Sequence, residues 1–99
     1  MHNSSDQLIL SLSYISVQRV VDRVEQTTQK TYHSICLFQD RITTSTRTFL
    51  LKHVFDLSYR PFSGHTGLFY LHTNEGVFTF EIEEEPEYFI SLFKQIQSN

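Results

Sequence analysis

The stretch GLFYLHTNEGVFTFEIEEEPEYFISLFKQIQSN, residues 67–99, decides the fold of this chain. Two aromatic-rich segments, Gly67–His72 and Val77–Ile82, alternate around the turn sequence Thr73-Asn74-Glu75-Gly76, which is the pattern of a β-hairpin. We expect the inward residues of the two strands to oppose one another, namely Phe69 and Leu71 against Phe78 and Phe80 or their neighbours.

A helix is predicted after this hairpin. Pro86 suits a first helical turn, where its missing N–H costs nothing. Apolar residues then follow at helical spacing and form one stripe, which must cover a sheet: Phe89, Leu92, Phe93 and Ile96. The acidic residues Glu83, Glu84, Glu85 and Glu87 surround the expected start of the helix, where the macrodipole favours negative charge.

Upstream, alternating apolar residues predict further strands at Leu8–Ile15 and Tyr32–Phe38. After a turn at Gln39–Asp40, the polar segment Arg41–Thr46 is typical of an edge strand. We expect Phe49–Tyr59 to be one long strand, bent and shared between two sheets at the corner of a barrel.

The segment Ser16–Glu25 is ambiguous. Its valines have helical spacing and Ser16 suits a helix cap, but valine favours strands and the helix would be short. We favour a strand that begins near Gln18 and continues through the polar residues 26–29, and the helical alternative stays open.

This order of elements resembles the bacterial PH-like (pleckstrin-homology-like) domains. The resemblance covers residues 8–97 and rests most on DRITTSTRTFLLKHVFDLSYR, LFYLHTNEGVFTFEI and EPEYFISLFKQI. It implies a mainly β fold, in which six or seven strands form a bent antiparallel barrel and one C-terminal helix caps its open end. It also implies a scaffold for binding lipid headgroups, peptides or other subunits, and fold analogy alone does not choose among these.

Length and composition predict one domain. The 99 residues include nine Phe and five Tyr, enough aromatic surface for a core without disulfides. We expect a flexible tail at residues 1–7 and a single domain at 8–99. The lone Cys36 is expected to be a buried small hydrophobe. Neither a signal peptide nor a membrane-spanning segment is evident, which favours a cytoplasmic protein.

The charge pattern limits the classes of binding partner that we expect. The net charge is −3, and the seven basic residues before Glu75 are dispersed and form no run of neighbouring basic residues. This pattern disfavours nucleic acid as a binding partner. The candidate ligand-binding residues are Arg19, Arg23, Arg41 and Lys52. PH domains that bind phosphoinositides carry clustered Lys and Arg near the first loop, whereas Asp22 and Glu25 dilute the two arginines here. Lipid headgroup binding is therefore the weakest of the binding hypotheses.

No catalytic or metal signature is evident. The five histidines lack the spacing of metal ligands, so no metal and no cofactor is expected. Ser58, His53 and Asp56 have the residue types of a catalytic triad, but the sequence contains no nucleophile elbow. His72 is expected to hydrogen-bond the backbone of the hairpin. We expect a non-enzymatic binding module for a protein segment or ligand. The alternative is a homo-oligomeric structural subunit that pairs through the edge Arg41–Thr48.

Overall fold

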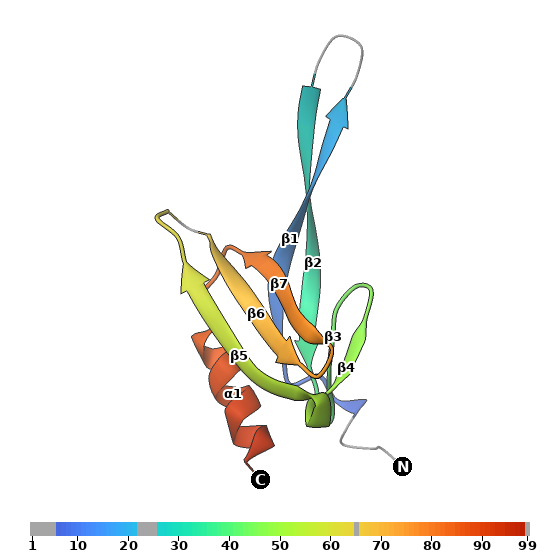
Figure 1. Ribbon diagram of the computed structural model, residues 1–99, viewed down its shortest axis with the longest axis vertical. Helices are drawn as coiled ribbons and strands as arrows, with labels where there is room; N and C mark the ends of the chain where they lie inside the picture. Colours follow the sequence, from blue (N-terminus) through green and yellow to red (C-terminus); the bar gives the residue numbers. More distant parts are fainter. Residues whose placement is uncertain (1–5, 22–25, 65, 99) are drawn as a thin grey trace.

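The fold is mainly β. Figure 1 shows a computed structural model, which describes residues 6–21, 26–64 and 66–98, without the side chains of 18–21 and 26–28. Within this part the strands are β1 (Leu10–Val21), β2 (Gln26–Leu37), β3 (Arg41–Thr43), β4 (Thr48–Leu50), β5 (Val54–Pro61), β6 (Gly67–Thr73) and β7 (Gly76–Ile82). A short 3₁₀ helix, η2 (Leu51–His53), joins β4 to β5, and α1 (Glu87–Gln97) follows β7.

The seven strands described form one antiparallel sheet in the order β4-β3-β2-β1-β7-β6-β5. The sheet is strongly bent and has two halves, β4-β3-β2-β1 and β7-β6-β5. The halves meet where β1 pairs with β7, and the described pairing there is one pair of residues, Ile15 opposite Glu81. The expected barrel does not close, because β4 and β5 remain the two edges of the sheet and are connected by η2 instead of by a ladder.

The β6–β7 hairpin has the predicted register. Phe69 lies opposite Phe80, and Leu71 lies opposite Phe78. Gly76 closes the turn with a φ of 122°, a conformation that residues with a side chain rarely adopt.

Two strand predictions are wrong in extent. Arg41–Thr46 is a strand only as far as Thr43, and β3 is internal because β2 and β4 pair with it on either side. Phe49–Tyr59 is not one strand, since Leu51 turns into the core in η2 and donates its N–H to the Asp40 carbonyl at 2.9 Å. A register shift at the start of β5 then leaves Phe55 exposed, against the predicted alternation.

The ambiguous segment is a strand as far as Val21, as favoured, but the predicted start near Gln18 is wrong, because residues 16–21 continue the first strand and together they form β1 from Leu10. One strand does not continue through to residue 29, because Gln26 begins β2, which pairs antiparallel with β1 from Val21 onward. Residues 22–25 of the prediction lie outside the described part. The β1–β2 hairpin projects as an arm beyond the rest of the molecule (Figure 1). The whole molecule, arm included, is 55 Å along its longest axis.

Helix α1 completes the core. Phe89 and Phe93 are buried as predicted, while Leu92 and Ile96 are half-buried and pack beside the core. The Phe89 ring meets Phe69 of β6 edge to face, with centroids 5.7 Å apart. The C-terminal end of the helix is held by Gln97, whose side-chain amide donates to the Val54 carbonyl at 2.8 Å.

Candidate functional site

The candidate site is a pocket at the seam where the two halves of the sheet part. Beyond the pair formed by Ile15 and Glu81, β1 and β7 diverge and leave a hollow of about 410 Å³. We call it the seam pocket; its lining residues are Tyr14, Ile15, Ser16, His33, Ser45, Thr46, Thr79, Phe80 and Glu81. Its volume lies in the range of small-molecule and short-peptide pockets.

Aromatic rings line the interior of the seam pocket. The buried Tyr14 ring packs on Phe80 at a centroid distance of 4.9 Å and on His33 at 5.1 Å. Tyr14 is fixed further by Ser45, because the two hydroxyl groups share a hydrogen bond of 2.7 Å. His33 shares a 3.0 Å hydrogen bond with the Ser16 hydroxyl. The rings are therefore positioned before any ligand arrives.

One wall of the pocket is an unpaired strand edge. Bonded and non-bonded pairs alternate along an antiparallel ladder, and the two-residue turn makes Thr73 and Gly76 a bonded pair. It follows that Val77, Thr79 and Glu81 direct their N–H and C=O groups away from β6. Glu81 uses this direction to pair with Ile15, but no described strand pairs there with Val77 or Thr79.

The far end of the seam is closed by side chains. Arg47, in the β3–β4 loop, forms an ion pair with Glu75 in the β6–β7 turn. Its guanidinium lies 4.5 Å from the ring centroid of Phe78, which in turn meets Phe49 edge to face. These contacts hold β4 against β7 without backbone hydrogen bonds, so the open stretch of β7 is bounded at both ends.

A charged cluster lies on the other face of β1, at the base of the arm. The Glu83 carboxylate accepts hydrogen bonds from Lys30 Nζ at 3.0 Å and from the Tyr32 hydroxyl at 2.9 Å. The bond from Lys30, followed by that from Tyr32, lowers the pKa of Glu83. The bond to Glu83 likewise raises the pKa of Lys30 and that of Tyr32.

This arrangement corrects the prediction for the acidic cluster. Of its four glutamates only Glu87 lies in the first turn of α1. Glu83 binds the arm, and Glu84 accepts the Ser13 N–H at 2.8 Å. The segment after β7 therefore ties the arm to the second half of the sheet, because the bend brings β1 beside the end of β7.

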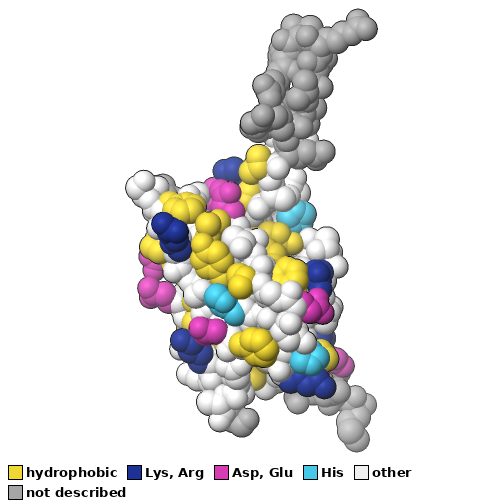
Figure 2. All heavy atoms as spheres, viewed as in Figure 1, with side chains coloured by type: hydrophobic (Ala, Val, Ile, Leu, Met, Phe, Trp, Pro, Cys, Tyr) yellow, Lys and Arg dark blue, Asp and Glu magenta, His cyan; other side chains and the backbone are white. Residues whose placement is uncertain are grey.

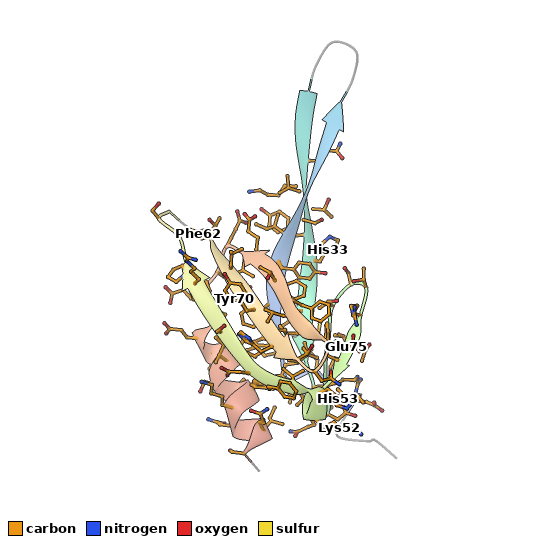
Figure 3. The ribbon with its side chains drawn as sticks, viewed as in Figure 1. His33, Lys52, His53, Phe62, Tyr70 and Glu75 are labelled. Carbon is orange, nitrogen blue, oxygen red and sulfur yellow. The ribbon has the colours of Figure 1, made fainter. Side chains whose placement is uncertain are left out.

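The structure places the side chains of two of the four predicted ligand-binding residues, Arg41 and Lys52, and both lie at the same end of the sheet, because Arg41 is paired with Leu50 and Lys52 lines a hollow with Leu50 and Asp40. Arg41 packs its guanidinium 4.1 Å from the Phe38 ring centroid and pairs with Asp40 at 2.7 Å. Lys52 is exposed in η2, at the end of the molecule away from the arm (Figure 3). Arg19 belongs to the arm and its side chain is not described; Arg23 lies outside the described residues.

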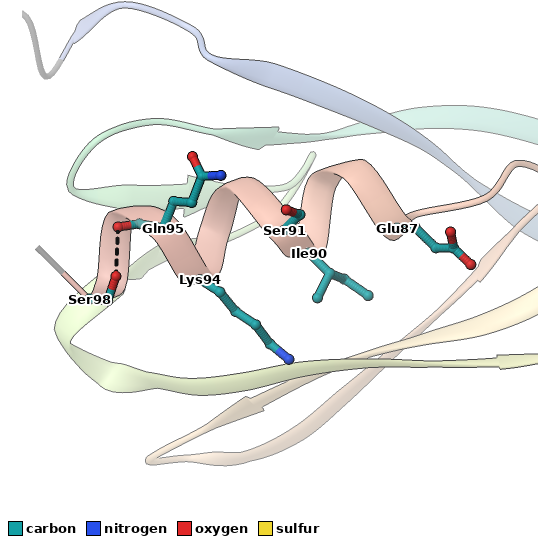
Figure 4. Close-up of a pocket in the computed structure, with 6 residues that line it drawn as sticks. All are labelled: Glu87, Ile90, Ser91, Lys94, Gln95 and Ser98. Atoms are coloured by element: carbon teal, nitrogen blue, oxygen red, sulfur yellow. Dashed lines mark hydrogen bonds between the residues drawn. The ribbon is translucent and has the colours of Figure 1, made fainter.

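A second hollow, on the surface of α1, is a weaker candidate. It measures about 650 Å³, but its six lining residues, Glu87, Ile90, Ser91, Lys94, Gln95 and Ser98, all come from α1 and the residue after it (Figure 4). One helix supplies a wall on one side only, and such a surface does not enclose a ligand.

A serine and a histidine meet on the outer face of the second half of the sheet. Ser58 Oγ lies 2.7 Å from His72 Nε2, so the partner of Ser58 is His72 and not His53. The bond also corrects the expectation that His72 bonds the hairpin backbone. Figure 2 shows this face, where apolar side chains lie over β5 and β6. Both residues stand on a regular ladder, away from any helix N-terminus that could stabilise an oxyanion.

The described part of the chain contains neither a metal-binding cluster nor a membrane-spanning helix. No group of three or more His, Cys, Asp or Glu side chains is placed there to hold a metal ion. The helices placed by the structure include none that is long and apolar enough to cross a membrane. Cys36, expected to be buried, is half-buried and forms no disulfide.

Comparison with known proteins adds no family. The chain matches no protein-family model, no curated protein and no solved structure.

Proposed function

We propose that this protein is a PH-like binding module, without catalytic activity, that captures a short extended peptide in the seam pocket. The strand order and the position of α1 support the PH-like assignment, since the resemblance implies seven strands in two bent halves and a C-terminal helix. The unpaired edge of β7 beside an aromatic-lined pocket carries the functional proposal.

The peptide adds to β7 by β-augmentation. In this mode main-chain hydrogen bonds give affinity and pockets for alternate side chains give specificity. Val77 and Thr79 offer the main-chain groups, and both residues are exposed. The stretch from Phe78, which Arg47 covers, to Glu81, which pairs with Ile15, spans about 10 Å at roughly 3.3 Å per residue, which is room for about three residues of a peptide.

The other edge of this half of the sheet is a poorer template. Along β5 the outward groups belong to Leu57 and Tyr59, by the alternation described above. Leu57 is only 2% exposed, so an incoming strand cannot reach its backbone. Pro61 lacks an N–H and the register shift near Val54 distorts the other end, two features that protect sheet edges.

The test uses a proline at the seam. A displayed library of random peptides is selected against the protein, and the binders are measured against Thr79→Pro. This change removes a free N–H without breaking the β6–β7 ladder, so folding is retained and the affinity should fall at least tenfold. Ser34→Pro is the matched control, because the Ser34 N–H points to a free edge of β2, and it should bind like the parent. Peptides that bind Thr79→Pro as tightly as the parent would refute the proposal.

Self-association is the second candidate. Of the edge expected for it, Arg41–Thr48, the part Arg41–Thr43 is internal, whereas Thr48 begins the edge strand β4. Strand β2 also has a free edge, where Lys30, Tyr32 and Ser34 are exposed and have no described strand beside them. Sedimentation at several concentrations tests this reading: a dimer that Ser34→Pro dissociates would favour it over peptide capture, and a constant monomer mass would exclude it.

A further inference from the structure

The two faces of β7 differ at the seam. Phe80 lies opposite the buried Phe69, so its side chain belongs to the core face of the sheet. Side chains alternate along a strand, so Thr79 and Glu81 belong to the other face. Glu81 pairs there with Ile15, on the face of β1 that carries the charged cluster described above. The carboxylate of Glu81 therefore does not belong to the ring side of the seam pocket.

On the core face the seam pocket has an aromatic floor and a hydroxyl rim. Tyr14 is buried, whereas Phe80 and His33 are half-buried and keep part of their rings open to the pocket. The rim consists of exposed residues with hydroxyl groups, namely Ser16, Ser45 and Thr46. None of the described residues that form this floor and rim is an Asp, Glu, Lys or Arg.

The charged groups described beside the seam are paired with one another. Arg47 pairs with Glu75 at the far end, and Lys30 pairs with Glu83 on the other face of β1. A charged peptide side chain on the ring side would lose its water without meeting an opposite charge, and this desolvation is unfavourable. The ring side of the pocket is therefore suited to an uncharged side chain.

The floor favours an aromatic ring among the uncharged side chains. Tyr14 already packs on Phe80 at 4.9 Å and on His33 at 5.1 Å between ring centroids. Aromatic pairs at about 4.5–7 Å gain free energy beyond that of their buried area. A further ring on the open parts of Phe80 and His33 would extend this packing, and the hydroxyl of a tyrosine could bond the rim.

We infer that the seam pocket selects a peptide with an aromatic residue, whose ring packs on Phe80 and His33 on the core face of β7. This inference rests on the proposed function and adds the chemical class of the ligand. The main-chain bonds to Thr79 hold the peptide beside β7, and alternation along the peptide places the neighbouring side chain beside Phe80.

The test compares four displayed peptide libraries that are identical except at one central position, which is fixed as Tyr, Leu, Lys or Glu. Binders from the Tyr library should bind the parent protein about tenfold or more tightly than those from the Lys and Glu libraries. They should bind about threefold more tightly than those from the Leu library, because only a ring gains the aromatic contacts.

Variants at His33 assign the preference to the floor. His33→Ala should remove the preference for Tyr over Leu, whereas His33→Phe keeps a ring there and should retain it. Thr31→Ala is the matched control, since Thr31 is exposed two positions away on the same strand and does not line the pocket. Circular dichroism should show that all three variants are folded. Thr79→Pro should weaken the binders from every library.

The outcomes separate the two proposals. If Lys or Glu binders match the Tyr binders and Thr79→Pro weakens them all, selection of an aromatic residue is refuted and peptide capture stands. Equal affinities for Tyr and Leu binders that His33→Ala leaves unchanged would refute it as well. A preference for Glu that His33→Phe removes would do the same, and would assign selection to the charge of His33. If no library gives binders sensitive to Thr79→Pro, both proposals fail.

Discussion

Glu83 shows how one side chain joins elements that are distant in the sequence. Its carboxylate receives both Lys30 and Tyr32 of β2, 53 and 51 positions away. All three groups are exposed to solvent, so the cluster positions the arm more than it stabilises the fold.

The cluster predicts a pH dependence. The lowered pKa of Glu83 means that its stabilising effect is present above the ordinary carboxyl value of 4.5 and is lost as the pH falls through its folded value. The raised pKa of Lys30 means that its effect is present below 10.5 and is lost as the pH rises through its folded value. Glu83→Gln should lower the melting temperature slightly and evenly between these limits.

In acid the difference in melting temperature between Glu83→Gln and the parent should become smaller, because protonation of Glu83 weakens the same bonds to Lys30 and Tyr32 in the parent. Melting temperatures measured by circular dichroism from pH 3 to pH 9 test this, with the exposed Glu85→Gln as the control. A difference between Glu83→Gln and the parent that stays constant down to pH 3 would contradict the assignment of the bonds.

Strand β7 differs from its neighbour β6 in one respect that matters for function. Both edges of β6 are paired, with β5 on one side and β7 on the other. One edge of β7 is paired throughout, whereas the described pairing on the other edge is limited to Glu81 with Ile15. The seam therefore arises because the edge of β7 that faces away from β6 is left largely without a paired strand.

Amide hydrogen exchange should alternate along β7. The N–H groups of Phe78 and Phe80 bond β6, so they should exchange slowly, whereas those of Val77 and Thr79 point into the seam and should exchange faster. Residue-resolved exchange by NMR measures this, and β6 is the internal control because its amides bond on both sides. Equal protection of all four β7 amides would show that the seam is closed.

Helix α1 is integral to the fold. Phe93 is 0% exposed, so Phe93→Ala should cost about 3–5 kcal/mol of the free energy of unfolding, and Phe93→Asp should abolish folding because its carboxylate would be buried without a partner. Tyr88→Ala on the same helix is the control, since Tyr88 is 66% exposed and its loss should change stability by at most about 0.5 kcal/mol. Urea unfolding measures both, and a parent-like stability for Phe93→Ala would contradict the role of α1.

At the scale of the whole molecule, the basic residues are dispersed along the sequence without a basic run. Arg41 is engaged by Asp40 and Phe38, and Lys52 lies at the end opposite the arm that carries Arg19. Charges separated by more than the Debye length of about 8 Å at physiological salt act almost independently. The molecule thus offers no convergent site for a phosphorylated headgroup among its described residues.

Binding to anionic vesicles should be absent at about 150 mM salt. Co-sedimentation with vesicles that contain phosphatidylserine or a phosphoinositide measures it, with neutral vesicles as the control. Micromolar binding that is lost in the double variant Arg19→Glu and Arg23→Glu would contradict this expectation and favour the headgroup-binding alternative.

The sequence by itself determined the local elements. Alternation placed the β6–β7 hairpin in its register, and the helical stripe placed α1, because each pattern reflects burial of one face within a few residues of chain. The same reasoning failed at Phe49–Tyr59, where Leu51 and Val54 are both buried across a 3₁₀ turn that no period-two pattern describes.

Only the tertiary structure decided the site. Tyr14, Ser45, Thr79 and Glu81 come from three separate parts of the chain, and they meet because β1 crosses to β7 at one pair and then leaves it. Alternation does put Tyr14 on the inner face of its strand, but pairing between residues 66 positions apart depends on packing of the entire sheet, and a local pattern carries no information about it. For the same reason the sequence pointed to dispersed arginines as ligand-binding residues, whereas the bend of the sheet placed an open strand edge beside an aromatic pocket.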